Sequence, residues 1–512
     1  MVDKLAQLER AGDLNGAIQL LSTQQLTPNE FAAVAIALYQ SDLSRVPFLT
    51  VQMLINNGIE HCVLHALSAH LGLRLGQDET AARSMRRLVD LVANDDTGPR
   101  KNVRDLIEPS FPRDVIIAAH SGNHALTRSL TKLWAVAVPE TERRFATPPT
   151  DRQRDIARFR VPAESRLIEL RSPPTGMPRP ARRAVIGIRH LWIPVQPASR
   201  EHDMPARVAS ALEAYGWQSL RHDLHDLEDP ALVADDYAAI AALCRESEAD
   251  LLILDEFQPN RAGRAAGEII RALRRERPQL KIVGLYMDPW VKEQWDGIEA
   301  GADCLDCAWS LVVTAFWQRP AFAGKTLSMP FPHGGEYPPA PALQPSFVFG
   351  GGVQCSNWDR ALWLGALDKA QLPLRIAVST HENDKLEPLA SYRAYMRQMM
   401  TGEAILNFAR RSNGMHTLTG RTFETLATAG LLVQERSDDI DRFFIANRHY
   451  LRFETITDLL DIAHLLQTEP DLAEDIRQTG AKFFRDRFAD ERLIGYLDYQ
   501  LFHRAANERA AA

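Results

Sequence analysis

Cysteine is scarce in this sequence, with five among 512 residues. Thiols spread so thinly do not form the disulfide framework of a small secreted protein. Long apolar runs are also missing, because no stretch of about 18 uncharged apolar residues occurs. Residues 1–9 lack the apolar core of a signal peptide. We therefore expect no transmembrane segment and a cytoplasmic protein with reduced thiols.

An excess of basic charge is a third absence. The formal net charge is -7 and the isoelectric point is about 6.1. A general nucleic-acid binder needs a basic surface, so no nucleic-acid partner is expected. With 45% hydrophobic residues, the composition is that of an ordinary globular protein. The length predicts two to four domains.

The chain begins with a stretch of helical periodicity. Leucine and alanine recur at helical spacing from Leu5 to Leu21 and again from Leu71 to Leu88, around Gly-Asp and Gln-Asp turns. The pattern predicts an all-α domain over residues 1–138, either a divergent tetratricopeptide-like helical repeat or a plain helical bundle. It contains no chemical motif, so we expect it to bind a partner, such as a protein acceptor, or to serve self-association.

Residues 139–182 are rich in proline and arginine, which predicts a connector that runs over a surface. We expect its arginines to be solvated. From Ala184 the pattern changes to buried strands alternating with helices, which predicts two doubly wound α/β domains, residues 183–335 and 345–500. A second linker lies between them. Ligands of such domains bind beyond the carboxyl ends of the strands.

The strongest local pattern is strand, loop, helix and strand over residues 404–433. A short apolar strand ends near Phe408, and the helix expected from Phe423 to Ala429 is closed by Gly430. The run Thr419-Gly420-Arg421-Thr422-Phe423-Glu424 stands at the loop-to-helix junction. Free N–H groups at a helix start bind phosphate, Arg421 adds positive charge, and Glu424 is placed to hold a ribose diol. Alternatively, Glu424 only complements the helix dipole.

This run, followed by Glu435-Arg436, resembles the donor-site signature of group 1 glycosyltransferases, most closely a spore-maturation-protein-like bacterial branch. The resemblance covers residues 345–500 and is fainter over 183–340. It implies a GT-B fold of two Rossmann-like domains, a nucleotide-sugar donor and no metal or other cofactor. Many retaining members have a second Glu eight positions before the helix Glu, but this chain has His416 there. The retaining outcome is therefore not implied.

Further donor-site candidates follow from position. Gly351 and Gly352 are expected directly after a strand at Phe347–Phe349, where glycines let a phosphate approach the backbone. Arg360, on the next helix, is either a phosphate ligand or a solvated helix charge. Asn413 and Thr419 belong to the same loop as Arg421. The donor site is thus expected to lie wholly in the second sheet domain.

Two residues of the first sheet domain are candidates for the base that activates an acceptor. Asp288 ends the strand from Lys281, and His202 precedes a predicted helix. His202 is otherwise a polar loop residue. Asp235 and Asp236 are interpreted as a helix start. Cys304 and Cys307 have metal or redox spacing, but no second ligand pair is near, so we expect two partly buried thiols and no metal site.

The sequence as a whole predicts a glycosyltransferase that moves a sugar from a nucleotide-sugar to a hydroxyl of a protein or glycan. A protein acceptor would dock on residues 1–138. Two alternatives stay open: a non-catalytic scaffold that kept the fold, and a nucleotide-sugar epimerase.

Overall fold

The structure is a computed structural model, and it describes ten parts of the chain. These parts are residues 1–93, 144, 154–173, 181–189, 204–224, 230–259, 265–333, 344–352, 360–379 and 400–504. Short gaps inside them fall at residues 25, 41–42, 288, 290–291, 361–362, 365, 368–369, 371, 373 and 411–414.

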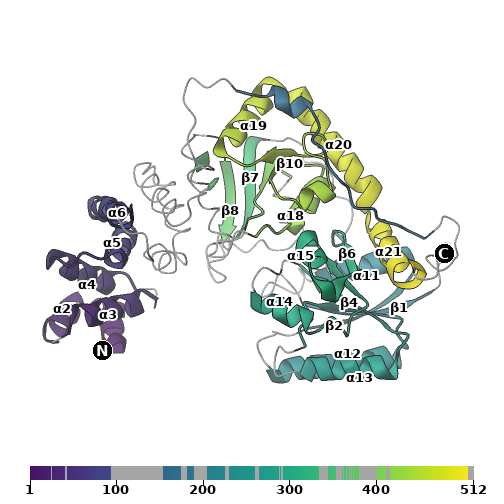
Figure 1. The fold of residues 1–512 in the computed structure, drawn as a ribbon, viewed down its shortest axis with the longest axis horizontal. Coiled ribbons are helices and arrows are strands. Elements are labelled where there is room, and N and C mark those ends of the chain that lie inside the picture. The colour runs from purple at the N-terminus through teal and green to yellow at the C-terminus, as the bar shows by residue number, and fades with distance from the viewer. Residues whose placement is uncertain are drawn as a thin grey trace.

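The described residues before position 94 are helical, as the periodicity predicts (Figure 1). The helices are α1 (Val2–Arg10), α2 (Leu14–Ser22), α3 (Pro28–Gln40), α4 (Arg45–Asn56), α5 (Cys62–Arg74) and α6 (Asp78–Ala93). Consecutive helices pack in pairs, α1 with α2, α3 with α4 and α5 with α6. Gly12, Gly58 and Gly76 follow three of them with φ of 77°, 80° and 69°, a conformation that ends a helix at little cost for glycine. A tetratricopeptide-like identity stays a prediction.

Two parallel sheets follow, which confirms the predicted fold class. The first has the order β2-β1-β3-β4-β5-β6 and the second β11-β10-β9-β7-β8. The strands of the first are β1 (Arg183–Ile188), β2 (Gln218–Asp223), β3 (Leu251–Asp255), β4 (Lys281–Tyr286), β5 (Cys307–Ser310) and β6 (Thr326–Ser328). Those of the second are β7 (Gln344–Gly352), β8 (Leu374–Ser379), β9 (Gly402–Asn407), β10 (Leu431–Glu435) and β11 (Leu451–Phe453). Every residue of β3 and of β10 is buried, because helices cover both faces of each sheet.

Alternate side chains of a strand pack on opposite layers of helices. In the first domain, Ile186 contacts the layer of α11 (Met204–Tyr215), and Val185 contacts the layer of α12 (Pro230–Glu246) and α13 (Ala265–Glu276). Two shorter helices, α14 (Lys292–Glu299) and α15 (Val313–Trp317), complete the first domain. In the second domain, α18 (Gly420–Ala427) and α20 (Pro470–Phe488) share one cluster with Leu432, and α19 (Ile456–Thr468) shares the other with Val433.

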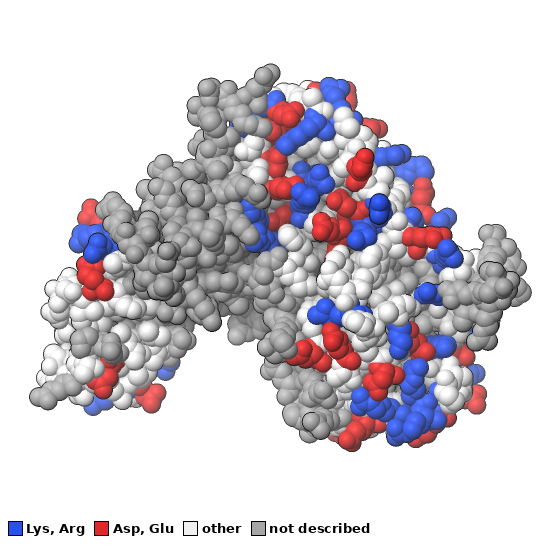
Figure 2. All heavy atoms as spheres, viewed as in Figure 1, with Lys and Arg blue, Asp and Glu red and all other residues white. Residues whose placement is uncertain are grey.

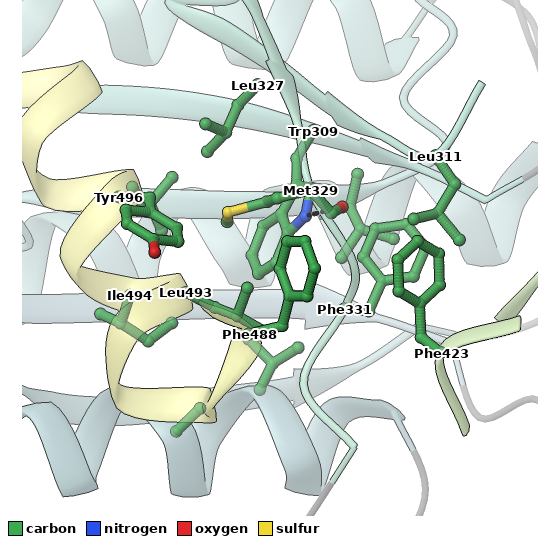
Figure 3. Packing of buried hydrophobic residues seen from close by; sticks show 14 of the residues in the cluster. Trp309, Leu311, Leu327, Met329, Phe331, Phe423, Phe488, Leu493, Ile494 and Tyr496 are labelled. Atoms are coloured by element: carbon green, nitrogen blue, oxygen red, sulfur yellow. Dashed lines mark hydrogen bonds between the residues drawn. The ribbon is translucent and has the colours of Figure 1, made fainter. Parts of the chain in front are cut away.

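The two sheet domains share one apolar core. Figure 3 shows Trp309, Leu327 and Met329 of the first domain beside Phe488 and Leu493 of the second. Helix α21 (Asp490–Asp498) carries the chain back onto α11 (Figure 1). There the Tyr215 hydroxyl donates to Asp498 Oδ2 at 3.1 Å, and Arg182 Nε lies 3.3 Å from Oδ1 of the same carboxylate. This shared core fixes how the two sheets face each other.

The carboxyl edges of the two sheets meet at Asp439. This residue follows β10, and its Oδ1 accepts hydrogen bonds from Thr314 N at 2.9 Å and Thr314 Oγ1 at 2.5 Å. Thr314 follows β5 at the start of α15. Burial raises the pKa of Asp439, while the two bonds from Thr314 oppose that rise. The edges at which such sheets bind ligands therefore lie opposite each other.

The described part of the connector lies along the second domain. Ala163 N donates to Ala446 O at 3.0 Å, and Ile168 N donates to Arg442 O at 2.8 Å. Two of its arginines form ion pairs, although Arg160 is also exposed to solvent, as predicted. Arg158 pairs with Asp458 at 2.7 Å, and Arg160 pairs with Glu469 at 2.6 Å. The connector is thus held to the second domain by backbone bonds and ion pairs.

Three local predictions are also corrected. Gly351 and Gly352 belong to β7 itself, paired with Val378 and Ser379, because the strand continues past Phe349. Helix α18 begins at Gly420, three residues earlier than expected. Asp236 lies inside α12, where it is buried with Oδ1 2.9 Å from His222 Nε2, so it does not start the helix.

Candidate functional site

The first turn of α18 is organised around Asn407, the last residue of β9. The Asn407 side chain is fully buried. Its Oδ1 accepts from Thr419 Oγ1 at 3.0 Å and from Arg421 Nη1 at 3.1 Å. Its Nδ2 donates to Thr422 Oγ1 at 2.8 Å and to Gln434 Oε1 at 2.7 Å. Both donors and both lone pairs of the amide are therefore used, which fixes the helix start against β9 and β10.

Arg421 carries a buried positive charge. Its side chain is 9% exposed, and its guanidinium carbon lies 4.9 Å from the centre of the Phe349 ring. Within the described residues, its only polar partner is the neutral amide of Asn407, and its Nε has no acceptor. A buried cation without a carboxylate is costly, so this position favours a bound anion.

Arg360 lies against the same ring. It is 6% exposed, and its guanidinium carbon is 5.9 Å from the Phe349 centre. The reading of Arg360 as a solvated helix charge is therefore wrong. Two guanidinium groups therefore lie near the aromatic ring of Phe349 in β7. They bring two positive charges close to the start of α18, where phosphate can be bound.

Glu424 is half-buried in the second turn of α18 rather than the first, because the helix starts early. Its carboxylate still reaches back toward the helix start. A Cβ added to Gly420 would lie 3.5 Å from Glu424 Oε1. The structure thus brings together Thr419, Gly420, Arg421 and Glu424, with Arg360 nearby. Asn413 and the two candidate bases, Asp288 and His202, lie outside the described residues.

A cavity of about 350 Å³ opens beside this cluster, at the carboxyl ends of β10 and β11. It is lined by Arg144, Arg410, His416, Glu435, Arg436, Ser437, Asp438, Glu454 and Thr455. On the face drawn in Figure 2, acidic and basic side chains are likewise interspersed over both sheet domains. The cavity is therefore a polar site with both signs of charge, not a basic patch.

Glu435 holds one wall of this cavity, a role that sequence reasoning missed. Its Oε2 accepts from the backbone N–H of Ala409 at 2.8 Å and of Arg410 at 3.1 Å. Its Oε1 forms an ion pair with Arg144, whose guanidinium carbon lies 5.2 Å from the Trp363 ring centre. Arg144 precedes both sheet domains, so this cavity is not lined by the second domain alone. No local motif in the sequence marks Arg144.

His416 stands exposed at the cavity wall. Partial desolvation of the ring lowers its pKa. The charge of Glu435 opposes this effect, and the charge of Arg410 adds to it. A lowered pKa favours the neutral imidazole, the form that can accept a proton.

The two cysteines that the sequence singled out do not form a reactive or metal-binding site. Cys304 and Cys307 are free and fully buried, and burial raises their pKa values to about 11 and about 12. They are thus unreactive thiols. Among the described residues, no group of three His, Cys, Asp or Glu side chains is placed to hold a metal ion. In the same residues, no helix is long and apolar enough to span a membrane.

The model of a family described as glycosyl transferase-like matches residues 347–497, from β7 into α21. The chain is a glycosyltransferase. The matched segment holds the cluster at the start of α18 and all of the described cavity wall except Arg144. A comparison with the sequences of curated proteins found no match.

Solved structures with a similar fold include three glycosyltransferase-related proteins. One is a glycosyltransferase from Rickettsia africae, 10% identical with a TM-score of 0.39, over 62% of this chain and 98% of that chain. The second is Anabaena Alr3699/HepE with UDP and glucose, 8% identical with a TM-score of 0.40, over 65% and 100%. The third is an O-GlcNAc transferase mutant from Thermobaculum terrenum, 14% identical with a TM-score of 0.35, over 95% and 100%.

The buried charge of Arg421 leads to a prediction about stability and binding. Replacing Arg421 with Met removes a buried charge and keeps most of the side-chain volume. We expect the melting temperature of Arg421→Met to equal or exceed that of the parent protein, since apolar replacement of buried ions is often neutral or stabilising by about 1–4 kcal/mol. Binding of nucleoside diphosphates should fall at least about tenfold.

Thermal melts and calorimetry on the same samples check both parts. Arg448→Met, at an exposed arginine of the same domain, is the matched control and should change neither quantity. A lower melting temperature with unchanged binding would show that Arg421 has a purely structural role.

Proposed function

We propose that this glycosyltransferase takes a nucleotide-sugar as donor and transfers its sugar to a hydroxyl of a protein or glycan acceptor. The observation that carries the proposal is the pair of buried guanidinium groups, Arg421 and Arg360, beside the start of α18. A nucleoside diphosphate is a leaving group with several negative charges. Fixed positive groups in a buried site stabilise the charge that develops as it departs.

Each residue of the cluster has a role in this proposal. Arg421 and Arg360 bind the diphosphate, together with the free N–H groups at Thr419 and Gly420. Glu424 accepts hydrogen bonds from the ribose hydroxyls, since its carboxylate turns back toward the same helix end. Asn413, Gly351 and Gly352 complete the donor site. The two arginines neutralise the charge of the diphosphate, a task that a divalent cation can perform in other enzymes. We therefore propose that transfer needs no metal.

The acceptor is proposed to reach the donor from the opposite sheet edge. The Thr314–Asp439 contact holds the two carboxyl edges together, so a hydroxyl bound at the first domain would face the donor sugar. Asp288 and His202 of that domain are the sequence-based candidates for the base. Holding donor and acceptor in this geometry converts a bimolecular reaction into one within a complex.

Glu424 tests the donor site directly. We expect Glu424→Ala to lose about 1.5–3 kcal/mol of nucleotide affinity, the value of hydrogen bonds to a charged group. That is roughly a 10- to 150-fold rise in Kd at an unchanged melting temperature. Calorimetry with a nucleoside diphosphate measures it, with Asp475→Asn on the exposed face of α20 as control. Parental affinity in Glu424→Ala would leave Glu424 only a helix-dipole role.

The helices before position 139 are proposed to dock a protein acceptor, because paired helices offer an extended surface. Arg144 and the connector belong to the donor side, so a truncation must spare both. We expect a protein beginning at residue 139 to bind nucleotide and hydrolyse donor normally, and to lose transfer to its acceptor. A protein beginning at residue 181 should also lose nucleotide affinity, since it leaves the buried Glu435 without Arg144.

Donor hydrolysis and acceptor transfer, measured on both truncations, separate these effects. Unchanged acceptor transfer by the protein that begins at residue 139 would assign the helices to assembly instead. Unchanged nucleotide affinity in the protein that begins at residue 181 would remove Arg144 from the donor site.

A further inference from the structure

His416 lies where the second sheet domain contacts the first. Arg410 and His416 form an antiparallel bridge, and Thr417 N donates to Ala409 O at 2.8 Å, so both ends of the loop are tied to the end of β9. Met415 packs on an apolar cluster of the first domain that contains Phe257, Tyr286 and Phe316. His416 is therefore next to a residue that touches the acceptor-side domain, while its own side chain lines the donor-side cavity.

The charged groups around His416 come from three parts of the chain. Arg410 and Arg144 contribute positive charge, and Glu435 and Asp438 contribute negative charge. Desolvation has the largest effect on the pKa of His416, and by lowering this pKa it favours the unprotonated ring. Glu435 and Asp438 would then stabilise the imidazolium once a proton arrives. This combination of a neutral ring and nearby carboxylates suits proton transfer.

The hydrogen bonds that close the loop do not need an imidazole. The bridge to Arg410 and the bond from Thr417 to Ala409 are both made by backbone atoms, which any side chain at position 416 would leave in place. The exposed ring therefore has no part in these closing bonds, and its position at the cavity is open to a chemical role.

We propose that His416 is the base that accepts the proton of the acceptor hydroxyl, an assignment that rests on the proposed nucleotide-sugar transfer. The acceptor oxygen attacks the anomeric carbon and forms the new C–O bond as its proton passes to the His416 ring. The bond between the anomeric carbon and the phosphate oxygen breaks, and the nucleoside diphosphate leaves with that electron pair. A single displacement of this kind inverts the anomeric centre.

Donor hydrolysis tests this assignment without knowledge of the acceptor, because water then takes the place of the acceptor hydroxyl. The full-length protein is assayed with UDP-glucose, GDP-glucose and ADP-glucose, and binding of UDP, GDP and ADP is measured by calorimetry. His416→Gln keeps a polar side chain that cannot take the proton. His464→Gln, on a half-buried histidine of α19, is the matched control.

For His416→Gln we expect a kcat about 10²- to 10⁴-fold lower, with nucleotide Kd within about twofold of the parent. The parent kcat should fall as pH drops through the lowered pKa of His416, and this acid limb should be absent from the variant. Added imidazole should restore part of the activity of His416→Ala. The glucose first released by the parent should have the β configuration when the donor is α-linked.

Three results would overturn the assignment while leaving the donor site intact. The first is a His416→Gln variant that binds nucleotide normally and has a kcat within about threefold of the parent. The second is an unchanged acid limb in the pH profile of that variant. The third is release of α-glucose by the parent. A parent protein that binds none of the three nucleotides would instead overturn the proposed function, and His416 with it.

Discussion

The buried charge of Arg421, which no carboxylate among the described residues neutralises, is the constraint on which the second sheet domain depends. The fully buried Asn407 holds this guanidinium against Phe349, although a neutral amide cannot neutralise it. Cores avoid such an arrangement unless a ligand supplies the missing anion. The cluster is thus preorganised for a negatively charged group, and the early start of α18 adds free N–H groups on the same side.

The second requirement is that the two sheets present their carboxyl edges to each other. The apolar core shared by both domains and the crossing of α21 onto α11 fix this geometry, and Asp439 joins the edges through Thr314. A donor at one edge can then meet an acceptor at the other. The Arg144–Glu435 ion pair joins the cavity wall to a part of the chain that precedes both domains, and we therefore expect donor binding to depend on the connector.

The sequence predicted the fold because its signals are local. Buried strands such as β3 and β10 are nearly continuous apolar runs, and the junction at Thr419–Glu424 shows its helix start in its own residues. The element boundaries were less accurate: β7 includes the glycines that were expected to follow it. Contacts between distant residues leave no such signal. Asn407 and Gln434 are 27 positions apart, and Arg144 and Glu435 are 291 apart. These partners became visible only in three dimensions.

Calorimetric titration of the full-length protein with UDP, GDP and ADP in excess chelator tests the central claim most directly. We predict that at least one of them binds without a divalent metal, and that its affinity falls as salt screens the arginines. No binding of any of the three, or binding that requires added metal, would contradict a donor site built on Arg421 and Arg360.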